Sequence, residues 1–120
     1  MKNKFFYMML AATGVIFASA PSKAEDFKYR SEVTLTIGQS VILKGVRQSN
    51  CSDQAPGWKH IKRKLPKSGL GKFVDGGAGT TDSNSCGQNV AARGVKFIAQ
   101  KSGSEMLEIF KDPISITVKD

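Results

Sequence analysis

The feature that most constrains this chain is a strict alternation of apolar and polar residues. In "EVTLTI" (32–37) every second residue is apolar, and "ISITV" (114–118) repeats the pattern near the C-terminus. Successive side chains of a β-strand point to opposite faces, so this period of two predicts strands with one buried face and one solvated face.

Other segments extend the pattern. Strands are predicted at 40–46 after the Gly38 turn, in "GVKFIAQ" (94–100), in "EMLEIF" (105–110) and after the Asp112-Pro113 break. About seven short strands separated by turns predict an all-β fold, an antiparallel β-sandwich.

Two central segments are harder to assign. In "WKHIKRKL" (58–65), helical spacing places Trp58, Ile61 and Leu65 on one face, whereas strand spacing separates Trp58 from Ile61. The neighbouring strands favour a strand here. "DGGAGTTDSNSCGQN" (75–89) has four glycines and almost no apolar residue, which predicts a loop.

The first residues have the pattern of a secretory signal peptide. Lys2 and Lys4 precede the apolar run "FFYMMLAATGVIFASA", and small residues permit cleavage after Ala20 or Ala24. Pro21 disfavours the first site, so we predict removal of residues 1–24 and one domain over 25–120, secreted or periplasmic. A retained transmembrane anchor is the alternative, but the run is short for one.

The two cysteines, Cys51 and Cys86, both lie after the predicted cleavage site. An oxidising compartment and an even count predict one disulfide between them. Two free thiols or a metal pair form the alternative, which is disfavoured because the chain has one His and no CxxC spacing. No metal and no cofactor is predicted.

The net charge of the chain limits the classes of partner that it is expected to bind. Removing residues 1–24 takes away three lysines and leaves 15 basic and 10 acidic residues. This modest excess, together with export, argues against nucleic acid as a partner.

Three stretches carry a family resemblance. "VTLTIGQSVIL" resembles the opening strands of immunoglobulin-like domains, "LPKSGLGKFVDG" resembles a segment of bacterial Ig-like and cadherin-like modules, and "VKFIAQKSGSEMLEIF" with "ISITV" is similar to their closing strands. The resemblance covers residues 32–118 and implies an Ig-like β-sandwich scaffold.

The chain also departs from that family. The positions of Cys51 and Cys86 do not match the inter-sheet disulfide of antibody domains, and the cadherin-like calcium motifs are absent. Because Ig-like folds carry many functions, the resemblance implies a scaffold and leaves the activity open.

The sequence gives little support for a catalytic site. His60 is the only histidine and has no acidic neighbour in sequence, so a small hydrolase built on it is disfavoured. We expect a protein without enzymatic activity.

The remaining candidate is a basic stretch. No acidic residue occurs between 54 and 74. Two interpretations stay open, lysines that keep an edge strand soluble and a docking site for an anionic partner. The candidate partner-binding residues are Trp58, Lys59, Lys62, Arg63, Lys64, Lys67 and Lys72.

The expected function is therefore an exported Ig-like binding module whose partner is an acidic glycan, a lipid surface or an acidic protein. Within it, Trp58 is more typical of a core residue than of a stacking platform. A protein inhibitor of an exported enzyme is the alternative, with the cysteine-anchored 75–89 segment as its contact loop.

Overall fold

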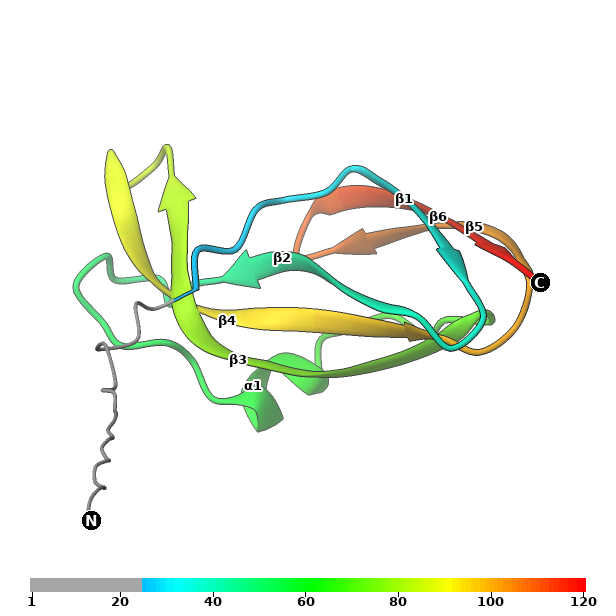
Figure 1. The fold of residues 1–120 in the computed structure, drawn as a ribbon. Coiled ribbons are helices and arrows are strands. Elements are labelled where there is room, and N and C mark those ends of the chain that lie inside the picture. Colours follow the sequence, from blue (N-terminus) through cyan, green and yellow to red (C-terminus); the bar gives the residue numbers. More distant parts are fainter. Residues whose placement is uncertain (1–24) are drawn as a thin grey trace, which may run out of the picture.

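Two three-stranded sheets pack face to face in the computed structural model, which describes residues 25–120 (Figure 1). The first sheet has the order β1-β6-β5 and the second has the order β2-β4-β3. The elements along the chain are β1 (Glu32–Thr36), β2 (Ser40–Val46), α1 (Trp58–Lys62), β3 (Gly71–Ser83), β4 (Gln88–Ala99), β5 (Gly103–Ile109) and β6 (Asp112–Lys119).

The predicted all-β sandwich is confirmed, because each segment with apolar alternation lies on a strand. The six strands, together with an isolated parallel bridge between Asp26 and Thr80, account for the expected number of about seven. Two pairings differ from the expected antiparallel arrangement. They are the Asp26–Thr80 bridge and the pairing of β1 with β6, in which Val33 lies beside Ile116. The first strand of the sandwich is thus held by the last.

The main core lies between the sheets and is built from the alternating residues. Their apolar side chains point inward, as the period of two predicts. Its buried members are Val33, Leu35, Leu43, Leu70, Phe97, Ala99, Ile109, Ile114, Ile116 and Val118. Ile37, which continues the pattern in sequence, lies after the end of β1 and is exposed.

The strand expected in "WKHIKRKL" is wrong, because residues 58–62 form the short helix α1. The amides of His60 and Ile61 both donate to the carbonyl of Gly57, which starts the helical turn. Ile61 is fully buried in a second, smaller core cluster with Val46 and Val95. Helical spacing lets Trp58 and Leu65 pack against that same cluster, and this packing outweighs the preference set by the neighbouring strands.

The loop expected over 75–89 is also wrong, since most of it belongs to the β3–β4 hairpin, with the turn at its tip. The pairing register shifts between Asp75 and Ala78, at a bulge where Gly77 has a φ of +91°. Bulges bend a strand, and beyond this one the hairpin turns away from the sandwich (Figure 1). Backbone pairing supplies the order that the apolar content of the segment did not predict.

The expected disulfide between Cys51 and Cys86 is confirmed. It joins the connection between β2 and α1 to the tip of the β3–β4 hairpin, closing a sequence separation of 35 residues. The bent hairpin is therefore attached to the domain at its far end as well as at its base.

Residues 25–30 form an N-terminal strap across this bent hairpin. The amide of Phe27 donates to the carbonyl of Thr80, and the amide of Thr80 donates to the carbonyl of Glu25. Phe27 is only 2% exposed. Its ring lies against Gly79 and Gly94, where an added Cβ would come within 2.7 Å and 2.9 Å of ring atoms. The hairpin glycines thus form a cradle for one aromatic ring.

The predicted signal peptide, residues 1–24, lies outside the described residues. Among residues 25–120, no helix is long and apolar enough to span a membrane.

Candidate functional site

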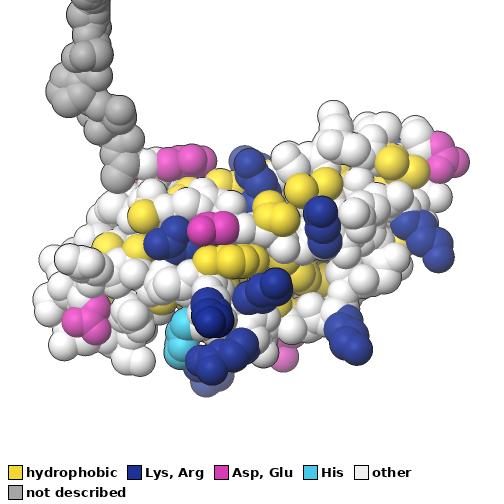
Figure 2. Space-filling model, turned by 90° about the horizontal axis from the view of Figure 1, so that it is seen from below, with side chains coloured by type: hydrophobic (Ala, Val, Ile, Leu, Met, Phe, Trp, Pro, Cys, Tyr) yellow, Lys and Arg dark blue, Asp and Glu magenta, His cyan; other side chains and the backbone are white. Residues whose placement is uncertain are grey.

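The basic residues predicted as a contact site gather around α1. Lys59 and Lys62 lie on the helix, Arg63 and Lys64 follow it directly, Lys67 lies in the connection to β3, and Lys72 is the second residue of β3. All six are exposed. Figure 2 shows Lys and Arg side chains gathered around the single histidine on this face. We call these six residues the basic surface.

The edge-strand interpretation applies to one member only. Lys72 lies on β3, which is an edge strand of the β2-β4-β3 sheet. Residues 59–67 lie outside every strand. Protection of a strand edge therefore does not explain most of this charge.

Three members of the basic surface converge on one hollow. Lys62, Lys67 and Lys72 line a groove of about 390 Å³, which we call the lysine groove. Its apolar lining comes from Leu65, Pro66 and Phe73, with Ser68 and Gly71 completing it. The sequence did not predict this groove, because its lysines and its apolar side chains come from a helix, a connection and a strand.

Trp58 and His60 contribute differently from the lysines. Trp58 is partly buried and packs against the second core cluster, so it anchors α1 to the sandwich. His60 is exposed, and its Nδ1 lies 3.4 Å from a guanidinium nitrogen of Arg63. In the part of the chain that the structure describes, the imidazole has no hydrogen bond to a hydroxyl or a carboxylate, the partners that a base in nucleophilic catalysis uses.

Charge pairing separates the basic surface from the rest of the domain. Within residues 25–120, ion pairs join Lys28 to Asp26 and Asp82, Lys44 to Asp112, and Arg93 to Asp75. None of the six residues of the basic surface forms one in that part of the chain. One carboxylate lies beside the lysine groove, that of Glu105, which accepts hydrogen bonds from the Ser68 hydroxyl and the Gly69 amide. It forms no ion pair with the basic surface, whose six charges are therefore available to a partner.

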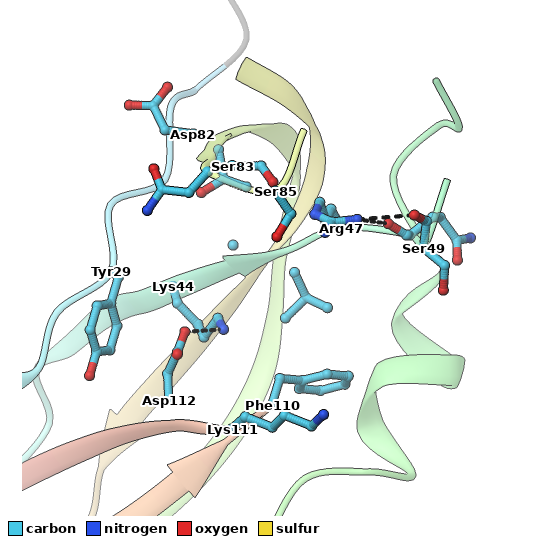
Figure 3. A pocket seen from close by; sticks show the side chains of 15 residues that line it. Tyr29, Lys44, Arg47, Ser49, Asp82, Ser83, Ser85, Phe110, Lys111 and Asp112 are labelled. Atoms are coloured by element: carbon cyan, nitrogen blue, oxygen red, sulfur yellow. Dashed lines mark hydrogen bonds and ion pairs between the residues drawn. The ribbon is translucent and has the colours of Figure 1, made fainter. Parts of the chain in front are cut away.

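A second, larger groove lies beside the β5–β6 turn. It has a volume of about 710 Å³ and is lined by the end of β2 with the residues that follow, the distal part of β3 and the turn itself (Figure 3). We call it the turn groove. The Lys44–Asp112 ion pair lies within it, with a distance of 2.5 Å between Nζ and Oδ2. No group of three or more metal-binding side chains occurs in the part of the chain that the structure describes.

Comparisons with family models, with curated proteins and with solved structures find no match for this chain.

Among residues 25–120, the ion pair between Asp26 and Lys28 in the strap is the one whose pKa values are shifted, and it gives a first prediction. Hydrogen bonds from Lys28 and then Asn89 hold the pKa of Asp26 below its ordinary value, and the bond to Asp26 raises the pKa of Lys28. A depressed carboxyl pKa stabilises the fold above the unfolded value of about 3.9, and this contribution is lost as the pH falls through the folded pKa. We expect NMR titration to find a lowered pKa for Asp26 that moves upward in Lys28→Gln. An unchanged pKa in that variant would contradict the pairing.

Proposed function

We propose that this protein is an exported, non-enzymatic binding module with an Ig-like scaffold, which docks onto an anionic partner through the basic surface. The observation that carries the proposal is the lysine groove, where Lys62, Lys67 and Lys72 surround an apolar lining. No acidic residue occurs between positions 54 and 74, and none of these three lysines forms an ion pair among residues 25–120.

The arrangement favours a partner that is both anionic and partly apolar. Three ammonium groups attract carboxylate, sulfate or phosphate groups, and their field speeds encounter with such a partner. Leu65 and Phe73 offer apolar surface for whatever lies between those groups. An anionic lipid surface meets both requirements, and an acidic glycan or an acidic protein meets the first.

Two further features support an exported scaffold. The Cys51–Cys86 disulfide is typical of oxidising compartments outside the cytosol. The sheet order β2-β4-β3 matches the B-E-D order of one immunoglobulin sheet, with β3 and β4 in the places of strands D and E. In chain order α1 stands between the strands compared with B and D, where an immunoglobulin domain has strand C, so Lys59 and Lys62 lie on a segment that departs from that pattern.

The second prediction tests the lysine groove. We expect the wild-type protein to bind vesicles containing phosphatidylglycerol at low salt, and to bind phosphatidylcholine vesicles much less. The interaction should fade above about 0.1 M salt, where the Debye length falls to about 10 Å. Replacing Lys62, Lys67 and Lys72 together with Gln should weaken co-sedimentation with the anionic vesicles by about tenfold or more, because the three charges act on one hollow.

The control removes the same charge elsewhere. Arg30, Lys101 and Lys119 are exposed, lie outside the lysine groove and form no ion pair among residues 25–120. Their replacement with Gln should leave most of the binding in place. Equal losses in both triple variants would reduce the effect to net charge and refute the groove as a site. Both variants should keep the wild-type unfolding midpoint, because exposed charges contribute little stability.

One observation favours a second candidate, a protein inhibitor of an exported enzyme. The β3–β4 hairpin bends away from the sandwich and is held at its tip by the disulfide (Figure 1). A rigid projecting hairpin suits insertion into an enzyme cleft. If this candidate is right, capture of a partner should survive the lysine triple variant and be lost when Asn84 and Ser85 at the tip are both replaced with bulky residues.

A further inference from the structure

We propose that the turn groove is a binding site for a short carboxylated saccharide, held by Arg47 and Lys111. This site is separate from the lysine groove, with which it shares no residue. Its volume of about 710 Å³ lies within the range of about 300–1,000 Å³ typical of small-molecule sites.

The backbone of the β5–β6 turn gives the first indication. Ile109 pairs with Asp112, so only Phe110 and Lys111 form the turn, and both have left-handed backbone with φ of 48° and 71°. Turns of this kind prefer Asn-Gly, because side chains other than Asn or Asp are disfavoured at positive φ. This turn therefore keeps two bulky residues at positions where the backbone favours others.

Packing explains why Phe110 occupies the turn, but it does not explain Lys111. The Phe110 ring packs against both core clusters, which gives it a structural role. Lys111 is exposed, and its ammonium has no hydrogen bond or ion pair within the described part of the chain. Strained positions tend to concentrate where side chains serve binding. The strain at Lys111 therefore points to a ligand that the ammonium contacts.

The charged side chains that line the groove are three cations, Lys44, Arg47 and Lys111, and two carboxylates, Asp82 and Asp112, so the lining carries one net positive charge. Lys44 is paired with Asp112, and Asp82 lies toward Lys28, with 3.8 Å between its Oδ2 and the Lys28 Nζ that Asp26 binds more closely, so Arg47 and Lys111 are the cations of the lining without an acidic partner among residues 25–120. Arg47 is oriented by its own backbone, because one guanidinium nitrogen donates to the carbonyls of Gln48 at 2.7 Å and Ser49 at 3.2 Å. No acidic group pairs with Arg47 among residues 25–120. A fixed guanidinium and a free ammonium on one groove suit a carboxylate.

The neutral lining favours a saccharide over a simple anion. Hydroxyl and amide side chains border the groove and match the hydroxyl groups of a sugar; they are those of Gln48, Ser49, Thr81, Ser83, Asn84 and Ser85. Tyr29 and Phe110 lie on either side of the Lys44–Asp112 pair, with Ser83 and Ser85 across the groove from Lys111 (Figure 3). The Tyr29 hydroxyl donates to the carbonyl of Pro113, which fixes its ring at the edge of the groove. Aromatic rings with a few placed polar groups are typical of ligand sites.

The test uses the full mature domain and an α-1,4-linked trigalacturonate as the probe. We expect titration followed by NMR to shift amide signals of residues 47–49, 83–85 and 110–112, with a dissociation constant in the range of about 0.1–10 mM. The fully methyl-esterified trimer, which lacks the charge, should bind at least about tenfold more weakly.

Lys111→Gly separates binding from folding. Gly suits positive φ, so this variant should unfold at a higher temperature than the wild type and yet bind the trimer about tenfold more weakly. Lys111→Arg should keep the affinity, and Arg47→Gln should lose it. Lys119→Gln, an exposed charge outside the groove, and the lysine triple variant should both bind as the wild type does.

Three results would overturn the proposal. They are no shift with the trimer at about 10 mM, equal affinity for the trimer and its methyl ester, and equal or tighter binding of hexaglutamate at the same residues. The last result would assign the groove to acidic peptides.

Discussion

Phe27→Ala should destabilise the domain by about 3–5 kcal/mol, the range found when a buried Phe is truncated in a core. The ring is 2% exposed and lies in the cradle formed by the hairpin glycines and Gly45. Because small domains have a total stability of about 5–15 kcal/mol, this change removes a large part of it. Urea unfolding of the mature protein, monitored by circular dichroism, measures the difference.

A double-mutant cycle tests whether the cradle and the ring depend on each other. A Cβ at Gly94 would lie 2.9 Å from the Phe27 ring, so Gly94→Ala alone should cost about 1–3 kcal/mol. In the Phe27→Ala background the ring is gone, and the same substitution should cost clearly less. Met106→Ala, at an exposed position, serves as the control and should change stability by less than about 0.5 kcal/mol. Strict additivity in the cycle would contradict a fitted contact.

Replacing Cys51 and Cys86 together with Ala should cost roughly 3–4 kcal/mol, the chain-entropy value for a loop closed over 35 residues. The effect should also be local. Amide exchange should speed up most at the hairpin tip near Cys86 and in the residues after Cys51, because the disulfide joins those two segments, while the β4–β5–β6 part of the core keeps its protection until global unfolding.

Reduction of the wild-type protein provides the matched measurement. Under a thiol reductant the wild type should lose as much stability as the double Ala variant, and the variant should not respond to the reductant at all. An unfolding midpoint that is the same with and without reductant would show that the disulfide adds nothing to the stability of the folded domain.

The strands could be predicted where the residues that determine them lie close together in the sequence. A strand can be predicted from a few alternating residues, such as Val33 with Leu35 or Ile114 with Ile116. The disulfide can be predicted from the number of cysteines. The segment 75–89 could not be assigned in this way, because the apolar group that covers it is Phe27, about fifty residues earlier in the chain. Helix α1 was not predicted for a related reason. Ile61 is buried against Val46 and Val95, which are distant from it in the sequence.

The two grooves likewise differ in how far their residues lie apart in the sequence. The basic stretch is visible in sequence because its charges are consecutive, and the structure adds the apolar lining from Leu65, Pro66 and Phe73. The turn groove joins Tyr29, Arg47, Ser83 and Lys111, which no sequence spacing connects. The one local signal was a two-residue turn without Asn or Gly, which is apparent only after the strand pairing is known.

The parallel pairing of β1 with β6 has a consequence for biogenesis. If the chain is threaded across a membrane from its N-terminus, β1, which ends at Thr36, emerges long before its partner strand, which begins at Asp112. Phe27 likewise cannot be buried until Gly79 and Gly94, which form its cradle, have emerged. Folding can then be completed only after β6 has emerged, so a chain that stalls before β6 leaves its first apolar strand open to chaperones and proteases.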